Sequence, residues 1–236
     1  MRVWVRLISF VVLFALSVVI VGCSQDLPGN KKISARVVEV IDGDTVKVKL
    51  DGEEETVRML LIDTPETNHR EKGEQPFGSQ AKRFVTKLLP PGKEVLLEKG
   101  ENERDKYGRL LAYLYLDEQT SVQQLLLERG LARVAYVFEP DAKYEDFYRQ
   151  LENSAKKKSL GIWSVRDYAR ADGFHPEAVE AEAQFVASKN SAVYHKISCS
   201  AAKQIKRKNR VFFRTEQEAI ASGRHRSQSE CRANTR

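Results

Sequence analysis

Cysteine is scarce in this chain of 236 residues, which contains only Cys23, Cys199 and Cys231. Three cysteines are too few for a scaffold stapled together by disulfides. A hydrophobic content of 42% and a charged content of 31% are instead typical of a soluble globular protein. The length allows one good-sized domain with a smaller appendage.

An excess of positive charge is also missing from most of the chain. The formal net charge is +6, yet residues 1–188 taken together are slightly acidic. The surplus lies in residues 189–236, which hold twelve Lys or Arg residues against three Asp or Glu residues. This C-terminal segment is therefore the part of the chain that we expect to attract polyanions.

Residues 1–23 do not read as part of a folded domain. Two arginines precede an apolar run over residues 8–21, which stops just before Gly22 and Cys23. This pattern resembles a bacterial lipoprotein signal, in which the cysteine is lipidated and becomes the first residue of the mature chain. The alternative is an uncleaved transmembrane helix, since the run approaches the ~20 apolar residues needed to span a bilayer. With Cys23 lipidated, residues 24–32 form a stalk and the protein is anchored to the extracytoplasmic face of the cell membrane.

From residue 33 onward the pattern changes to short strands. Residues 33–41, 45–50 and about 55–62 are β-branched or alternate between apolar and polar residues. Asp42-Gly43-Asp44 and Asp51-Gly52 separate them, and such sequences favour tight hairpin turns. A three-stranded meander is predicted.

Helical periodicity and further short strands follow. We expect helices over residues 77–89, 121–130 and about 143–158, and strands over residues 94–98 and 109–116. Ser121-Val122-Gln123-Gln124 has the pattern of a capping box that opens the second of these helices. Five strands with about three helices form a mostly β, α+β domain that is compatible with a small barrel of the OB type. Residues 166–184, rich in Ala, Asp and Glu, predict a linker or a solvated helix. Residues 185–236 form a short separate module, too small to be stable without a metal, a disulfide or docking.

Several charged or polar residues fall at the predicted strand ends and turns, where they can share one rim of a barrel: Asp44, Arg58, Asp63, Thr64, Glu66 and Arg109. Charged groups are costly to bury unless each is paired with an opposite charge, which another side chain, a metal ion or a substrate can provide. A purely structural ion pair is the simpler alternative. Two carboxylates with a threonine oxygen suit Ca²⁺, two arginines can grip a phosphate, and a glutamate can position or deprotonate water. Together these groups predict a phosphodiesterase.

Three separate motifs carry a resemblance to a known family: Ile41-Asp42-Gly43-Asp44-Thr45, the run from Val57 to Thr67, and Asp105-Lys106-Tyr107-Gly108-Arg109. Over residues 33–165 the chain resembles the thermonuclease (micrococcal-type nuclease) family. The resemblance implies an OB-fold and a Ca²⁺-dependent endonuclease. Such an enzyme would act on single-stranded and double-stranded DNA and on RNA, leaving 3′-phosphate ends. We expect a monomer.

The resemblance also implies a role for each matching residue. Asp44 and Asp63 would be carboxylate ligands of Ca²⁺, joined by the backbone carbonyl of Thr64, and Glu66 would be the general base. The others would contact substrate: Arg58 and Arg109 the scissile phosphate, Lys106 and Tyr107 the terminal phosphate, and Tyr136 a stacked base. One departure is that this domain is mildly acidic where a basic face is expected. The rival interpretation is an OB-fold lipoprotein that binds nucleic acid without cutting it.

The C-terminal module carries a second resemblance. Residues 189–199 resemble the small zinc-binding domain of bacterial alkylation-response methyltransferases, although that family typically ends in a Cys-x-x-Cys pair. His195, Cys199, His225 and Cys231 could still form a Zn²⁺ site. A disulfide between Cys199 and Cys231 is the competing interpretation outside the cytoplasm, and a degenerate module with neither is the third.

Overall fold

A computed structural model describes residues 31–68 and 74–228. The predicted signal peptide with Cys23, nearly all of the predicted stalk, and Cys231 lie outside these ranges. By its internal contacts the chain divides into residues 1–31 and residues 32–236, and everything that follows concerns the second unit. No helix among the described residues is long and apolar enough to cross a membrane.

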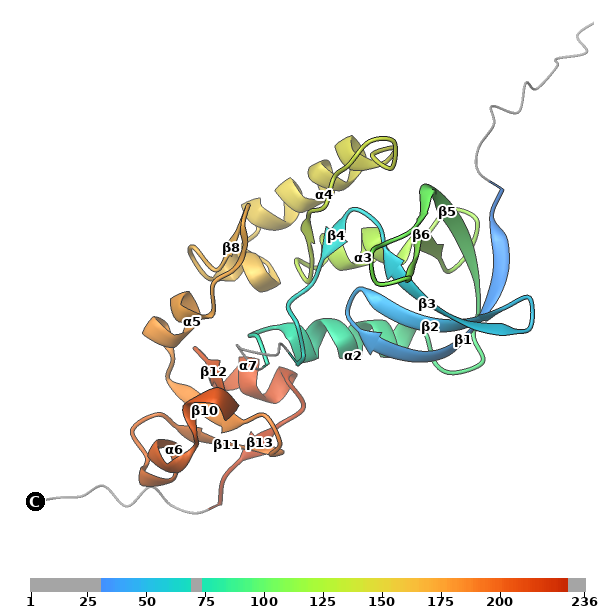
Figure 1. The fold of residues 1–236 in the computed structure, drawn as a ribbon. Helices are drawn as coiled ribbons and strands as arrows, with labels where there is room; N and C mark the ends of the chain where they lie inside the picture. Colours follow the sequence, from blue (N-terminus) through green and yellow to red (C-terminus); the bar gives the residue numbers. More distant parts are fainter. Residues whose placement is uncertain (1–30, 69–73, 229–236) are drawn as a thin grey trace, which may run out of the picture. The chain divides into compact units, whose positions relative to one another are not determined.

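Five strands close into a barrel in the order β1-β2-β3-β6-β5, and β5 pairs back to β1 (Figure 1). They are β1 (Ile33–Asp42), β2 (Thr45–Leu50), β3 (Glu53–Met59), β5 (Glu94–Arg104) and β6 (Leu110–Tyr115). The predicted meander is confirmed: β1, β2 and β3 are antiparallel neighbours. Its second turn places Asp51 and Gly52 at φ of 51° and 94°, the left-handed pair that a tight hairpin favours. The predicted five-stranded barrel is therefore present.

The core follows the alternation of the strands. Val46 and Val48 in β2 are completely buried. The lysines that alternate with them, Lys47 and Lys49, face outward. Val57 in β3 and Leu114 in β6 complete the same interior. Burial of these branched side chains is the main favourable contribution to the stability of the barrel.

Three helices belong to the barrel domain: α2 (Gly78–Leu88), α3 (Val122–Glu128) and α4 (Glu145–Lys157). Ala81 and Val85 of α2 are fully buried in the barrel core, and α2 packs against β1. Ser121 caps α3 by accepting a hydrogen bond from the Gln124 amide (3.1 Å), the role that the sequence predicts for it. The predicted complement of about three helices in this domain is observed.

The third strand is shorter than predicted. Pairing stops at Met59, and the chain resumes as β4 (Ile62–Asp63), which pairs with β7 (Arg133–Val134) instead of the barrel. Between them Leu61 adopts a left-handed φ of 62°. An uninterrupted strand over residues 55–62 was the wrong prediction, because the apolar pattern continues through a turn whose leucines are also buried.

Residues 166–184, predicted as a linker or a solvated helix, contain regular structure. They form the hairpin of β8 (Ala169–Arg170) and β9 (Gly173–Phe174), followed by α5 (Pro176–Glu182), while η1 (Gly161–Ser164) precedes them. Tyr168, Phe174 and Val179 are buried in one cluster with Phe77, which lies just before α2. The segment thereby adds a second small core against the barrel domain.

The C-terminal module is a four-stranded sheet in the order β12-β10-β11-β13. Its elements are β10 (Phe185–Ser188), β11 (Val193–Lys196), α6 (Ser200–Gln204), η2 (Arg207–Asn209), β12 (Arg210–Phe213), α7 (Glu216–Ala221) and β13 (His225–Arg226). Two supports for this small sheet are evident. Cys199 is disulfide-bonded, and Arg224 forms a buried ion pair with Glu74 beside α2 at 2.9 Å.

Candidate active site

Four of the predicted site residues are buried side by side at one end of the barrel. Asp44 lies in the β1–β2 turn, and the register that pairs Thr45 with Arg58 places it next to that arginine. Asp63 belongs to β4, and Thr64 follows it directly. Their exposed fractions are all below one tenth, so each charge needs a partner nearby.

Arg58 is the centre of this group. Its Nη2 lies 3.2 Å from Asp44 Oδ2 and 3.8 Å from Asp63 Oδ1. The same guanidinium donates hydrogen bonds to the carbonyls of Met59 (2.6 Å) and Ile62 (2.9 Å). The interruption between β3 and β4 therefore has a local cause, because the turn folds two carbonyls onto Arg58.

Asp44 is held by several donors. Thr45 Oγ1 donates to Oδ1 (2.9 Å), and Thr64 donates to Oδ2 through both its backbone N (3.0 Å) and its Oγ1 (3.1 Å). Gly43 makes this approach possible, since a Cβ at that position would lie 2.6 Å from Thr64 Oγ1. The turn and the segment after β4 are thus fixed against each other.

Glu66 is the exposed member of the group. The backbone N of Glu66 donates a hydrogen bond to Gln75 Oε1 at 2.9 Å. Partial desolvation of the carboxyl, together with the negative charges of Asp42, Asp44 and Asp63, raises the pKa of Glu66 to about 7. Sequence reasoning missed Asp42, whose Oδ2 accepts from Thr67 N at 3.1 Å; the Asp-Gly-Asp motif was the available signal.

The donor set fits Ca²⁺. Asp44 and Asp63 supply carboxylate oxygens close to the Thr64 backbone, and the group contains no sulfur or imidazole ligand. Burial is the main cause of the raised pKa values of Asp63 and Glu66, and the neighbouring carboxylates raise both pKa values further. A bound cation would oppose these shifts. No cluster of three or more His, Cys, Asp or Glu side chains suited to a metal occurs within residues 31–68 and 74–228; the predicted site uses two side chains and a carbonyl.

Arg133 is a second residue that sequence reasoning missed. Its Nε and Nη2 lie 2.9 and 2.8 Å from Asp63 Oδ2, because the β4–β7 register pairs the two residues directly. Its Nη1 donates to the Ala171 carbonyl (3.1 Å), and its guanidinium faces the Phe174 ring at 5.5 Å. Arg133 thereby connects Asp63 to the β8–β9 hairpin. No local sequence motif around Arg133 reveals this connection.

Arg109, Lys106 and Tyr107 form a separate group. Arg109 Nε is paired with Asp105 Oδ2 at 2.7 Å, and its guanidinium lies 5.5 Å from the Tyr107 ring. Arg58 pairs with Leu111 of the neighbouring strand β6, and Arg109 lies two residues before Leu111, just ahead of that strand. The structure therefore places Arg109 near the buried cluster but does not bring it into contact with the carboxylates of Asp44 or Asp63.

Tyr136 lies over the cluster. Its ring is 5.5 Å from the Arg58 guanidinium carbon, and the residue is 57% exposed despite being aromatic. It also adopts a left-handed φ of 55°, which is unusual for a bulky residue. A ring presented in this way is available for stacking.

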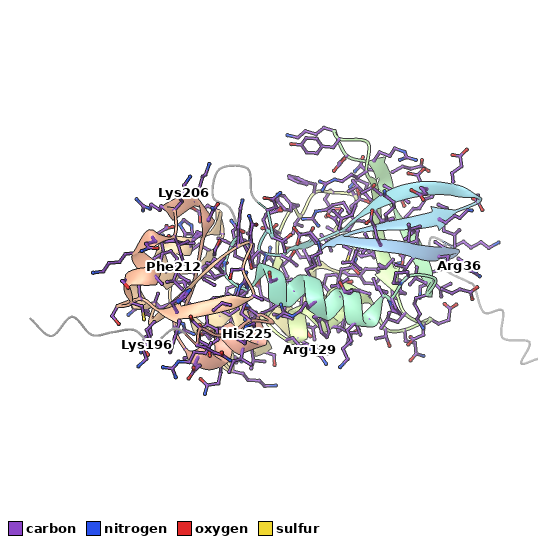
Figure 2. All side chains as sticks on the ribbon, turned by 90° about the horizontal axis from the view of Figure 1, so that it is seen from below. Arg36, Arg129, Lys196, Lys206, Phe212 and His225 are labelled. Carbon is purple, nitrogen blue, oxygen red and sulfur yellow. The ribbon has the colours of Figure 1, made fainter. Side chains whose placement is uncertain are left out.

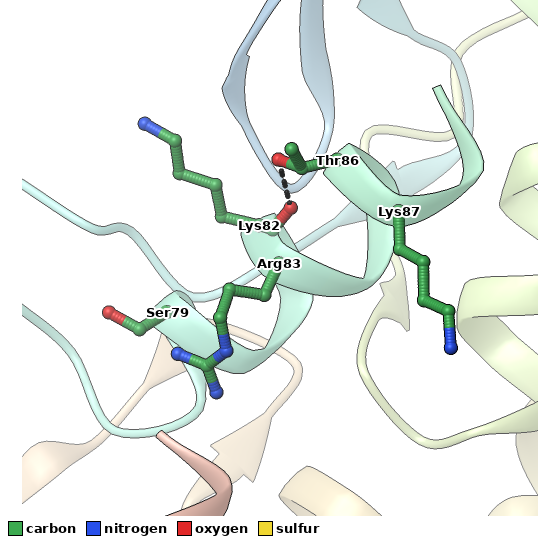
Figure 3. Close-up of a pocket in the computed structure, with 5 residues that line it drawn as sticks. All are labelled: Ser79, Lys82, Arg83, Thr86 and Lys87. Carbon is green, nitrogen blue, oxygen red and sulfur yellow. Dashed lines mark hydrogen bonds between the residues drawn. The ribbon is translucent and has the colours of Figure 1, made fainter. Parts of the chain in front are cut away.

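One pocket lies apart from these residues, on the outer side of α2 (Figure 3). It is lined by Ser79, Lys82, Arg83, Thr86 and Lys87. Arg83 donates a hydrogen bond to the Ser222 carbonyl of the C-terminal module. No predicted site residue lines this pocket.

The zinc site proposed for the C-terminal module loses one of its four ligands. Cys199 is disulfide-bonded, and a disulfide sulfur cannot serve as a thiolate ligand. His195 pairs with Val186 in the sheet, and His225 lies at its edge on β13. Among the interpretations of the sequence, the disulfide is the one consistent with Cys199; Cys231 lies outside the described residues.

Comparison with known proteins places the barrel domain in a family. Residues 56–165 match the model of the family described as staphylococcal nuclease homologue. Endonuclease YncB of Bacillus subtilis (strain 168) is 47% identical over 147 residues, 62% of this chain and 69% of that protein. The SPbeta prophage-derived endonuclease YokF of the same organism is 49% identical over 136 residues, 57% of this chain and 45% of that protein. Thermonuclease of Staphylococcus hyicus is 39% identical over 141 residues, 60% of this chain and 82% of that protein. The chain spans more than two thirds of endonuclease YncB and of the Staphylococcus hyicus thermonuclease at 47% and 39% identity. It therefore belongs to the staphylococcal nuclease, or thermonuclease, family.

Proposed function

We propose that this protein is a Ca²⁺-dependent endonuclease that hydrolyses DNA and RNA to products with 3′-phosphate ends. The observation that carries the proposal is the buried triad of Arg58, Asp44 and Asp63 with the exposed carboxylate of Glu66 beside it. Family membership and relatives named endonuclease or thermonuclease support the same reaction class.

Asp44, Asp63 and the Thr64 carbonyl are the groups that would hold Ca²⁺. When bound, Ca²⁺ supplies positive charge and Lewis acidity at the reacting phosphate. Arg58 keeps the two carboxylates converged by facing both of them. The hydrogen bonds from Thr64 and Thr45 fix the orientation of Asp44 before substrate arrives, which is the preorganisation that an electrostatic site requires.

Glu66 would position or deprotonate the attacking water, since it is the exposed carboxylate in this group. Arg58 and Arg109 would bind the phosphate oxygens, and Arg109 would also assist the leaving 5′-oxygen. In the structure Arg109 is occupied by Asp105 in a partly exposed pair. Such pairs contribute only about 0–1 kcal/mol, so a phosphate could displace Asp105 at little cost.

Substrate contacts would come from three exposed side chains. Tyr107 is 73% exposed and has Lys106 Nζ 5.1 Å from its ring centre, a pairing suited to a terminal phosphate. Tyr136 would stack on a base, and stacking is tolerant of sequence because every base has a π-face. These contacts predict broad specificity.

The test uses the chain without residues 1–23, incubated with labelled single-stranded DNA, duplex DNA or RNA, in Ca²⁺ or in chelator. Cleavage is expected only with Ca²⁺, and Glu66→Gln should lower the rate by about 10²–10³-fold, as losing one aligned transition-state contact does. The matched control is Glu53→Gln, on an exposed residue of β3, which should leave the rate unchanged. Products should resist extension by a polymerase until a 3′-phosphatase is added. Salt-sensitive binding without cleavage would instead identify a binding module.

We also propose that Cys23 carries a lipid that anchors the protein at the extracytoplasmic face of the cell membrane. The support is the charged start, apolar run and terminal cysteine of residues 1–23. Cys23→Ala should abolish incorporation of labelled fatty acid, with Cys199→Ala as the control that retains it. Full retention of label by Cys23→Ala would exclude this anchor.

A further inference from the structure

The C-terminal module contains a long stretch without negative charge. Between Glu182 and Glu216 there is no Asp or Glu residue, while eight Lys or Arg residues occur. Five of these eight lie within residues 203–210, so the charge is clustered as well as unbalanced. We name residues 203–210 the basic turn; it joins α6 to β12 through η2.

The cations of the basic turn point outward without carboxylate partners. Lys203, Lys206, Arg207 and Lys208 are all exposed, and none pairs with an Asp or Glu among residues 31–68 and 74–228. Figure 2 shows Lys206 at the periphery of the module, directed into solvent. Cations of the barrel behave differently: Arg104 lies 2.6 Å from Glu55, and Lys143 lies 2.7 Å from Glu98. No carboxylate of the described residues therefore neutralises these four cations.

The backbone of the basic turn is well braced. Arg210 donates from Nε to the Ile205 carbonyl (2.8 Å) and from Nη2 to the Lys203 carbonyl (3.2 Å). The Asn209 amide donates to the Lys206 carbonyl and its own carbonyl accepts from Lys189 N, both at 2.8 Å. One arginine thus organises the turn, and the remaining cations are free to meet a ligand at low ordering cost.

We infer that the basic turn binds the phosphate backbone of nucleic acid as a second attachment point outside the active site. The choice of nucleic acid as the polyanion rests on the proposed nuclease function. It is favoured further because the part of the chain that carries the candidate active site is slightly acidic and would repel a polyanion. Phosphate contacts from exposed Lys and Arg are independent of sequence, which suits a nuclease of broad specificity.

An anionic membrane surface is the competing occupant, and the composition of the basic turn disfavours it. Surface-binding segments combine cations with large apolar side chains that enter the headgroup region. None of the exposed large hydrophobic residues found in the described part of the chain lies within residues 203–210. A hydrophilic polyanion therefore matches the turn better than a bilayer does.

The experiment compares two triple variants of equal charge change. Lys206→Gln/Arg207→Gln/Lys208→Gln removes the centre of the basic turn, and Lys49→Gln/Lys93→Gln/Lys157→Gln removes three exposed cations from the barrel domain. Binding of a fluorescent 30-nucleotide single strand is followed by anisotropy in chelator, across a range of salt concentrations. The basic-turn variant should weaken binding about tenfold at low salt, and its slope of log K against log salt should fall by about 2, since each lost contact removes ~0.7.

An unchanged slope in the basic-turn variant, or an equal fall in the barrel variant, would overturn the inference. Vesicles containing phosphatidylglycerol provide the second arm: loss of vesicle binding with intact DNA binding would assign the turn to membranes. Binding is measured without Ca²⁺, so the result does not depend on cleavage. A protein that binds DNA through the turn but never cuts it would refute the proposed function while leaving this inference standing.

Discussion

At the scale of single residues, the candidate site depends on how buried charges are shared. Asp63 sits between Arg58, 3.8 Å away, and Arg133, 2.8 Å away. Arg58 is recognisable from sequence because it lies in the same short motif as Asp63. Arg133 is not, because it is 70 positions away and only the β4–β7 register brings it to Asp63. Local motifs therefore identify the acidic groups but not the full set of charges that balance them.

Arg133→Gln should destabilise the protein by about 3 kcal/mol in chelator, since removal of one partner leaves a buried charge poorly compensated. Urea unfolding measures the change. Arg36→Gln is the control: Arg36 pairs with Glu94 at 2.8 Å, but both side chains are more than half exposed, so its loss should cost less than about 1 kcal/mol. Equal effects of the two variants would mean that burial of the Arg133 pair has no energetic consequence.

At the scale of elements, sequence patterns identify strands and helices better than they identify interruptions. The alternation in β2 and the cap at Ser121 are local, and both appear as predicted. The turn at Leu60-Leu61 also has a local cause, because the Met59 and Ile62 carbonyls both accept hydrogen bonds from Arg58. The apolar pattern hides it, since the two leucines of the turn are buried like the residues of a strand. The β8–β9 hairpin was also hidden, since its aromatic residues are spaced irregularly and become buried only against Phe77.

The start of α5 provides a pH-dependent prediction. His175 precedes the helix and lies 3.0 Å from Asp172 and 2.9 Å from Glu177. The hydrogen bond to Asp172, followed by the one to Glu177, raises the pKa of His175 above its ordinary 6.5, while partial burial and the charge of Arg170 oppose the shift. The protonated imidazole should therefore stabilise the fold fully below the unfolded-state pKa, and this stabilisation should disappear as the pH rises through the folded-state pKa.

NMR titration of the His175 ring protons measures the shift directly. Asp172→Asn should bring the pKa of His175 back toward 6.5, whereas Asp146→Asn, on the separate helix α4, should leave it unchanged. A wild-type pKa at or below 6.5 would show that neither carboxylate favours the charged ring in solution.

At the scale of the whole molecule, the C-terminal module and the barrel domain share a buried ion pair. Arg224 Nη2 lies 2.9 Å from Glu74 Oε2, and both side chains are less than one tenth exposed. Ser79 also donates to Glu74, and Arg83 of α2 donates to the Ser222 carbonyl. Burial of such a pair is favourable only when both charges are present. The module should therefore unfold together with the barrel rather than separately.

Arg224→Gln tests this cooperativity, because it leaves the Glu74 carboxylate buried without its ion-pair partner. Its cost should be about 3–5 kcal/mol, read from one urea transition seen both by Trp163 fluorescence and by far-ultraviolet circular dichroism. Adding Glu74→Gln to Arg224→Gln should recover part of the loss, since no isolated charge then remains. Arg226→Gln is the matched control: Arg226 of β13 lies 3.7 Å from Glu216 of α7 in an exposed pair of the same module, and its loss should change stability by less than about 1 kcal/mol. Two separate transitions in the wild-type protein would show that the module and the barrel are independent folding units, and the ion pair between them would then contribute little to either.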